Sequence, residues 1–200
     1  MADETKPPQS EQHTFLFVMA GTAGLGAAAL GFSVLFNTPL GPQIEFDVND
    51  LLIGVIATTP LVVLLWWFSN TALEHLAAFR RSQIKFFSDI GFTFTPARIA
   101  VLAIGAGVSE ELLFRGVLQT WMAGFVPLVF AIILSNILFG VLHMRTVLYA
   151  FIAGLVGVYL GILYAATGNL LAPMSAHAFY DAVALEYTRR AVEHYKSGRI

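Results

Sequence analysis

Long apolar runs separated by short polar stretches dominate this sequence. About 20 apolar residues at 1.5 Å per residue cross a hydrocarbon layer of about 30 Å, so each long run is a candidate transmembrane helix. Six stretches qualify, at residues 15–36, 49–69, 97–121, 126–144, 147–166 and 169–188. Segment 71–94 instead alternates apolar with charged side chains, which favours either an amphipathic interfacial helix or an ordinary loop helix. The pattern predicts an all-α, polytopic transmembrane helical bundle of about six spans plus one amphipathic helix.

Composition supports the bilayer as the main solvent of this chain. Hydrophobic residues make up 57% of the sequence and charged residues only 12%, whereas about a quarter of a soluble domain is charged. The net charge of −2 and the lack of a dense basic cluster exclude a nucleic-acid partner. Because the chain has no Cys, disulfide scaffolds, thiolate metal sites and cysteine nucleophiles are excluded as well.

Basic residues are distributed unevenly along the chain, and this predicts its orientation. The 37–50 loop has no Lys or Arg, whereas basic residues flank the spans at residues 80–85, 98, 145 and 189–199. The positive-inside rule therefore places both termini in the cytoplasm. We expect a flexible cytoplasmic tail at 1–14, membrane helices and the interfacial segment at 15–96, a catalytic helical core at 97–188, and a basic cytoplasmic tail at 189–200.

Small residues recur in two of the predicted spans. A missing side chain lets two helix backbones approach closely, so these positions are expected to mark helix packing rather than chemistry. The positions are Gly21, Gly24, Ala28 and Gly31 in the first span and Gly154, Gly157 and Gly161 in the fifth.

Polar side chains inside the predicted spans are few, and they indicate a functional site. A charged group at membrane depth costs about 2.5 kcal/mol or more, so such groups usually face a bundle interior or a wet cavity. They occur in three spans, as Glu110, Glu111 and Arg115, then Ser135, Asn136 and His143, then Ser175, His177 and Asp181.

Helical spacing separates Glu110 from Glu111 and Arg115 in the third span. Neighbouring helical residues point about 100° apart, so Glu110 and Glu111 cannot serve one site equally. Glu111 and Arg115 lie one turn apart and can neutralise each other, which leaves Glu110 free to face a cavity. The alternative is that all three groups form one buried ion network.

The two histidines have competing interpretations as well. His143 lies on one helical stripe with Asn136, where it serves either in a site or as a helix-end cap. His177 and Asp181 are spaced i, i+4, so the carboxylate can hold the imidazole tautomer, or the pair can simply join two helices. One carboxylate with two imidazoles and a further acceptor is the set that water-driven peptide hydrolysis requires.

Written in order, these residues form three motifs. They are Glu110-Glu111-x3-Arg115, Ser135-x3-Phe139-x3-His143 and His177-x3-Asp181, each on its own span. The order and composition resemble the CPBP family of intramembrane peptidases, which includes CAAX prenyl endopeptidases and bacteriocin-processing or immunity proteins. The resemblance covers about residues 97–185, while 1–96 match only as generic membrane helices.

The resemblance implies a role for each residue. Glu110 would activate the attacking water, His143 would help to hold that water, and His177 would stabilise the developing oxyanion. Asp181 occupies a position where many members have Asn; since an ionised Asp cannot donate a hydrogen bond, we expect it to orient His177. Glu111, Arg115, Asn136 and Phe139 would support the site.

Metal use and substrate stay open at this point. Glu110, His143 and His177 could complete an open three-ligand Zn²⁺ site, yet the sequence lacks the His-Glu-x-x-His signature of zinc peptidases. The expected substrate is a membrane-associated peptide or protein, with a CAAX-type prenylated protein as one option. The alternatives are a catalytically inactive peptide-binding scaffold or bacteriocin-immunity protein, and a small transporter using Glu110 and Arg115.

Helix depth conflicts with this site. With ideal helices perpendicular to the membrane, His143 lies near the inner boundary, Glu110 near mid-depth and His177 nearer the outer side. We expect tilt, shifted boundaries, or a broken start to the sixth span near Gly168 and Pro173 to bring the three side chains together.

Overall fold

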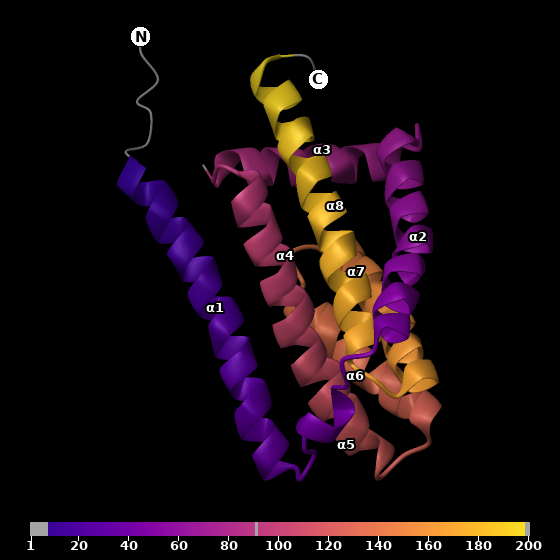
Figure 1. Ribbon diagram of the computed structural model, residues 1–200. Coiled ribbons are helices and arrows are strands. Elements are labelled where there is room, and N and C mark those ends of the chain that lie inside the picture. The colour runs from indigo at the N-terminus through magenta and orange to yellow at the C-terminus, as the bar shows by residue number, and fades with distance from the viewer. Residues whose placement is uncertain (1–7, 91, 199–200) are drawn as a thin grey trace.

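The computed structural model describes residues 8–90 and 92–198, and every regular element in these ranges is a helix (Figure 1). This confirms the predicted all-α fold class. The helices are α1 (Pro8–Leu35), the short 3-10 turn η1 (Gly41–Gln43), α2 (Val48–Asn70), α3 (Glu74–Asp89), α4 (Pro96–Glu111), the π-helix η2 (Leu112–Gln119), α5 (Thr120–Ala123), α6 (Leu128–Leu142), α7 (Val147–Thr167) and α8 (Leu171–Lys196).

Local signals in the sequence set several of these boundaries. Asp47, Thr95 and Thr146 each precede a helix and accept a hydrogen bond from the backbone N–H of a residue in its first turn. Pro96, whose missing N–H costs nothing in the first turn, follows Thr95. Gly168 ends α7 in the left-handed conformation, with φ 68°, which glycine adopts without a steric penalty.

Helix α8 lies between α2 and α4, while α6 and α7 lie behind it in the view of Figure 1. Two glycines permit this central packing. A Cβ on Gly107 of α4 would lie 2.8 Å from the backbone nitrogen of Ala178 in α8, and a Cβ on Gly54 of α2 would overlap Ser175 in α8. Helix α1 stands at the outer side of the bundle, against α4 and η2.

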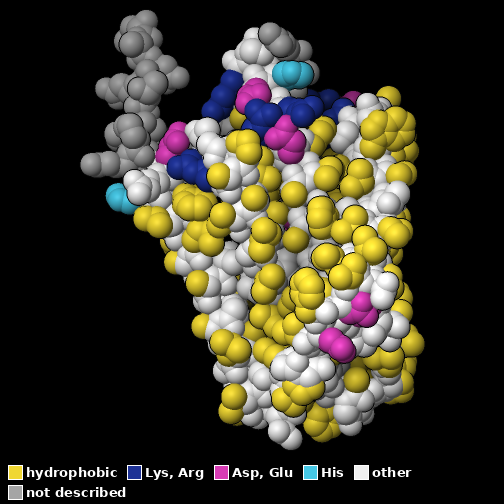
Figure 2. Space-filling model, in the orientation of Figure 1, with side chains coloured by type: hydrophobic (Ala, Val, Ile, Leu, Met, Phe, Trp, Pro, Cys, Tyr) yellow, Lys and Arg dark blue, Asp and Glu magenta, His cyan; other side chains and the backbone are white. Residues whose placement is uncertain are grey.

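Helix α3 runs across one end of the bundle, nearly at right angles to α2, α4 and α8 (Figure 1). It occupies the middle of segment 71–94, where the sequence predicts an amphipathic or loop helix. Its buried residues Ala77 and Ile84 face inward, and Ile84 packs with Ala191 and Val192 of α8. This end also carries the main gathering of Lys and Arg side chains on the face shown in Figure 2.

The predicted spans map onto this bundle with changes in length. In the described part of the chain, three helices are long and apolar enough to cross a membrane, at Glu11–Leu35, Val48–Asn70 and Val147–Thr167. The span predicted at 126–144 is the shorter apolar helix α6. The span predicted at 97–121 is the continuous helical run α4–η2–α5, which changes pitch at Leu112. The sixth begins at Leu171, two residues after the predicted position, and its polar residues lower its hydropathy.

Both predicted tails are partly helical, which corrects their boundaries. Helix α1 already begins at Pro8, within the tail expected at 1–14, and residues 1–7 of that tail lie outside the described residues. Helix α8 continues through the predicted span into the basic segment and ends only at Lys196. Its last turns are held by an ion-pair cluster in which Glu186 contacts both Arg189 and Arg190.

The small residues of the two spans have different outcomes. In α7, a Cβ on Gly157 would overlap Asn136 of α6, and a Cβ on Gly161 would lie 2.6 Å from Gln119 of η2, so close packing there is confirmed. In α1, a Cβ on Gly21, Gly24 or Gly31 would meet no atom of the described residues within 4 Å, so the packing prediction gains no support at these glycines. Much of α1 faces outward, with Phe17 80% and Val34 83% exposed.

Candidate active site

The structure brings Glu110, His143 and His177 together. Oε2 of Glu110 lies 3.7 Å from Nε2 of His143 and 3.9 Å from Nε2 of His177. The Glu110 side chain is only 14% exposed, and its Oε2 is buried without a hydrogen-bond partner among the described residues. A buried carboxylate oxygen without a partner is costly, so its retention between two imidazoles calls for a functional explanation.

The three side chains meet although ideal helices perpendicular to the membrane would hold them at different depths. With 15 residues, α6 is about 22 Å long, shorter than the hydrocarbon layer of about 30 Å. His143 caps its carboxyl end, where its backbone N–H bonds back to Phe139 and Gly140. Helix α8 starts at Leu171, and His177 lies in its second turn. The site is thus formed at the carboxyl ends of α4 and α6 and near the amino end of α8.

The orientation of His143 is set by the backbone. Its Nδ1 lies 2.8 Å from the carbonyl oxygen of Phe139, so Nδ1–H donates to that carbonyl and Nε2 remains an acceptor directed to Glu110. The ring also lies against Phe139, with centroids 4.3 Å apart, and Phe139 in turn makes an edge contact with Phe114. Phe139 therefore supports the imidazole through both its backbone and its ring.

His177 is oriented mainly by Glu111. Its Nδ1 lies 2.7 Å from Oε1 of Glu111, which is a strong hydrogen bond, whereas Asp181 Oδ2 lies 3.6 Å from Nε2. The sequence predicts the orienting role for Asp181 and pairs Glu111 only with Arg115. The structure gives the hydrogen bond to Glu111 and leaves Asp181, 28% exposed, at the more open side of the ring.

Arg115 holds Glu111 in place through a buried network of hydrogen bonds. Its side chain is fully buried and donates to Glu111 Oε1 at 2.8 Å, Asn136 Oδ1 at 3.0 Å and the Gly157 carbonyl at 2.7 Å. The guanidinium also lies over the ring of Phe139, 5.1 Å from its centroid. The predicted pairing of Glu111 with Arg115 is thus present, and Asn136 joins it from α6.

A change of helix type begins directly after the two glutamates. Residues 112–119 form the π-helix η2, in which hydrogen bonds join residues five positions apart instead of four as in an α-helix. Arg115, Gly116 and Gln119 are buried in it. Such segments often occur at functional sites, and this one carries Arg115 into the interior beside α6 and α7.

The zinc prediction gains no support from this geometry. Ligands of a tetrahedral Zn²⁺ with bonds of about 2.0 Å lie about 3.3 Å apart, which is shorter than the 3.7 and 3.9 Å separations here. Over the described ranges, no group of three or more His, Cys, Asp or Glu side chains is arranged to hold a metal ion. The described side chains are therefore not already arranged as a metal site, and the use of zinc stays a prediction.

Sequence reasoning missed two neighbours of the site. The Gly157 carbonyl accepts from Arg115, and only the run of small residues in the fifth span pointed to that position. Tyr149 lies beside His143, with ring centroids 6.5 Å apart.

Arg145, between α6 and α7, lies over the ring of Phe86 in α3, 3.9 Å from its centroid. Burial lowers the pKa of the Arg145 guanidinium, and the aromatic faces around it offset part of the cost of this burial.

Comparisons with known proteins agree with the three motifs. Residues 92–183 match the family model described as type II CAAX prenyl endopeptidase Rce1-like. The chain is also 35% identical over 88 residues to Uncharacterized protein YpbD of Bacillus subtilis (strain 168), and that match covers 42% of each chain. No solved structure matches this chain. The family resemblance predicted from the motifs is confirmed over residues 92–183, and together with the apolar helices it identifies an integral membrane protein.

Proposed function

We propose, on the premise that residues 92–183 are an Rce1-like region, that this chain is an intramembrane endopeptidase. It would hydrolyse a peptide bond in a membrane-associated protein or peptide, and a CAAX-type prenylated protein is one candidate substrate. The observation that carries this proposal is the buried, unpaired Oε2 of Glu110 facing the Nε2 atoms of His143 and His177.

The first step uses Glu110 and His143. Their facing atoms are 3.7 Å apart, too far for a direct hydrogen bond but close enough for one water to contact both. Glu110 removes a proton from this water while its oxygen forms a bond to the peptide carbonyl carbon. His143 accepts the second O–H of the water through Nε2, which is free because Nδ1–H donates to Phe139.

The second step uses His177 and Glu111. As the carbonyl oxygen becomes negative, it needs a donor, and Nε2–H of a protonated His177 faces the same space as Glu110. The Glu111 carboxylate accepts from Nδ1–H and so favours the doubly protonated imidazole, as a carboxylate does behind a catalytic histidine. The carbon–nitrogen bond then breaks, and Glu110 passes its proton to the leaving amine.

The buried network holds these groups at fixed positions. Arg115 links Glu111 on the third span to Asn136 on α6 and to the backbone of α7. His177 on α8 is joined through Glu111. Four helical segments are thereby tied to one guanidinium, so small movements of any of them change the reacting geometry.

The end of the bundle crossed by α3 is proposed to face the cytoplasm. This end carries the Lys and Arg cluster, as the positive-inside rule expects, and α1 begins and α8 ends there (Figures 1 and 2). Because the chain has no Cys, a single cysteine at Ser197 or Pro42 can report orientation without background. We expect a membrane-impermeant maleimide to label the variant with a cysteine at Ser197 only when the cytoplasmic face is exposed to the reagent. The variant with a cysteine at Pro42 should be labelled only from the opposite face of the membrane.

Glu110→Gln tests the peptidase directly. The change keeps the shape of the side chain and removes the base, so we expect a folded protein with turnover reduced by at least about 10²-fold. Comparative membrane proteomics of cells with wild-type or variant protein should then reveal uncleaved precursors. The matched control is Glu74→Gln on α3, a glutamate whose side chain is 77% exposed.

The outcomes separate the candidate functions. Normal cleavage by Glu110→Gln would contradict the assignment of the base. Full complementation of a null strain by that variant, without any cleavage, would identify a peptide-binding scaffold or immunity protein instead of an enzyme.

A further inference from the structure

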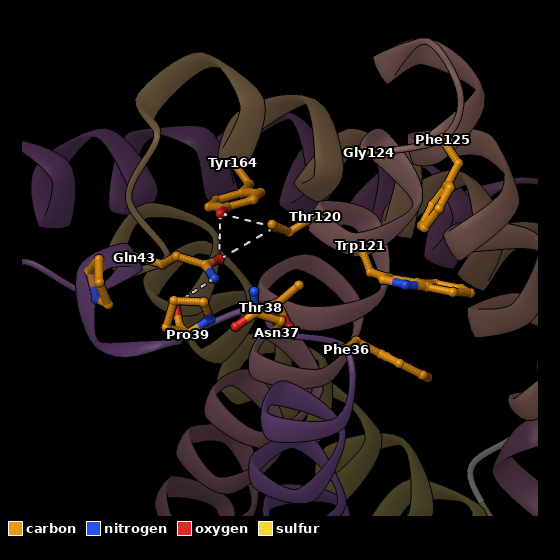
Figure 3. A pocket seen from close by; sticks show the side chains of 11 residues that line it. Phe36, Asn37, Thr38, Pro39, Gln43, Thr120, Trp121, Gly124, Phe125 and Tyr164 are labelled. Carbon is orange, nitrogen blue, oxygen red and sulfur yellow. Dashed lines mark hydrogen bonds between the residues drawn. The ribbon is translucent and has the colours of Figure 1, made fainter.

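A cavity lies beside α5 (Figure 3), at the end of the bundle that Figure 1 shows opposite α3. Its volume is about 510 Å³, within the range of sites that hold small molecules. It is formed where the loop after α1 meets α5 and the end of α7. The peptidase mechanism uses no residue of this cavity.

One wall of the cavity is polar and held rigidly by Gln43. The Gln43 Oε1 accepts from the Tyr164 hydroxyl at 2.5 Å, and Nε2 donates to the carbonyls of Pro39 at 2.9 Å and Gly116 at 3.1 Å (Figure 3). The Thr120 hydroxyl lies within 3.4 Å of the same Oε1. This wall is therefore preformed, which lowers the entropic cost of binding a ligand against it.

Thr38 beside this wall has a buried hydroxyl without a partner. The residue is 5% exposed, and within the described ranges its Oγ1 makes no hydrogen bond. Its backbone is fully used, since the N–H donates to the Ser33 carbonyl and the Thr38 carbonyl accepts from the Ser33 hydroxyl. An unpaired buried hydroxyl is costly, and a polar ligand group in the cavity would satisfy it.

The opposite wall is aromatic and continues into an apolar groove. Trp121 stacks on Phe36 with ring centroids 4.5 Å apart and makes an edge contact with Phe125 at 5.4 Å. Trp121 and Phe125 also line a neighbouring groove of about 280 Å³ that extends to Leu134 on α6. The pocket and the groove share Trp121 and Phe125, an arrangement that fits an amphiphile with its polar end at Gln43 and Thr38.

From these features we infer that the cavity binds one bilayer lipid with an uncharged glycerol head, such as a diacylglycerol. A glycerol oxygen bonds to Thr38, and one acyl chain lies over Trp121 and Phe125 towards Leu134. Among the described residues, no charged side chain lines the cavity. The adjoining segment 37–50 contains Glu45, Asp47 and Asp50 and no Lys or Arg, which disfavours an anionic headgroup. The inference does not depend on the peptidase proposal.

Tryptophan fluorescence provides the test. The chain has three Trp residues, and replacing the exposed Trp66 and Trp67 by Phe leaves Trp121 as the only one. The full-length W66F/W67F protein is placed in phosphatidylcholine nanodiscs containing increasing amounts of diacylglycerol brominated on one acyl chain. We expect saturable quenching of Trp121, whereas random contact with bulk lipid gives quenching proportional to the bromolipid fraction.

A pair of isosteric substitutions identifies the polar contact. In the W66F/W67F background, Thr38→Val should raise the amount of brominated diacylglycerol needed for half-maximal quenching by about fivefold. This is the effect of losing one hydrogen bond. Thr22→Val is the matched control, because the Thr22 hydroxyl already donates to Val18 on α1, and it should leave half-saturation unchanged. Unsaturable quenching, or equal effects of both variants, would overturn the inference. Tighter binding of brominated phosphatidylglycerol than of diacylglycerol would also overturn it.

Discussion

Replacing Arg115 by Met is expected to be among the most damaging single changes in this chain. The guanidinium is fully buried and makes hydrogen bonds to Glu111, Asn136 and the Gly157 carbonyl. Its loss leaves the Glu111 carboxylate buried with only His177 as a partner, and leaves Asn136 Oδ1 without its donor. Breaking a buried ion pair by removing one partner costs about 3–5 kcal/mol, so we expect the free energy of unfolding to fall by that amount.

An exposed pair of the same spacing supplies the control. Lys85 and Asp89 are also i, i+4 and 2.8 Å apart, but their side chains are 62% and 60% exposed. Lys85→Met should cause no measurable change, because solvent and salt screen such a pair. The assay is reversible unfolding in mixed micelles with increasing sodium dodecyl sulfate, followed by far-ultraviolet circular dichroism, with the wild type and both variants measured side by side.

The double variant Glu111→Gln/Arg115→Met distinguishes an ion pair from simple packing. Removing both charges should cost less than the sum of the two single changes, because neither charge is left alone in the interior. If Arg115→Met unfolds within about 1 kcal/mol of the wild type, or if the two single effects simply add, the coupled buried network is refuted.

Three further predictions concern the site and its packing. Asp181→Asn should retain turnover, because the amide keeps its shape beside His177 Nε2 and can donate a hydrogen bond; a loss as large as that of Glu110→Gln in a peptide-cleavage assay would contradict this. Gly157→Val should destabilise the bundle by about 1–3 kcal/mol in the micelle assay, since its side chain would overlap Asn136 and Arg115, whereas Gly21→Val on open α1 should be nearly neutral. Turnover should persist after treatment with 1,10-phenanthroline, because the proposed mechanism activates the water with Glu110 and His143 and needs no metal; a loss reversed by added Zn²⁺ would favour the metal hypothesis.

The sequence predicts much of the helix order and the division of the acidic pair. Apolar length alone locates α1, α2 and α7, since each exceeds the thickness of the hydrocarbon layer. The 100° rotation between successive residues separates Glu110 from Glu111, and the one-turn spacing pairs Glu111 with Arg115, as the structure has them. These features are local along the chain, so periodicity is sufficient to predict them.

The features that the sequence does not reveal depend on contacts between distant segments. The bond from His177 to Glu111 joins residues 66 positions apart, and the alternative partner Asp181 is favoured by spacing alone. The π-helix at 112–119 has no distinct periodicity in its sequence, so the sequence predicts ordinary helix geometry there. The contact between His143, at the end of α6, and Glu110, at the end of α4, joins residues 33 positions apart, and ideal helix depth does not predict it.

Glu111 is the residue through which fold and proposed chemistry are coupled. It is fully buried, and its Oε1 accepts from both Arg115 and His177, while its neighbour Glu110 contacts neither at hydrogen-bond distance. Glu110→Gln should therefore abolish turnover with little loss of stability, whereas Glu111→Gln should reduce both together. The amide introduced by Glu111→Gln can still accept from Arg115 or His177, but it leaves the imidazolium without a counter-charge. Turnover of the Glu111 variant should then fall even in conditions where the protein remains folded, and unchanged turnover under those conditions would assign Glu111 to stability alone.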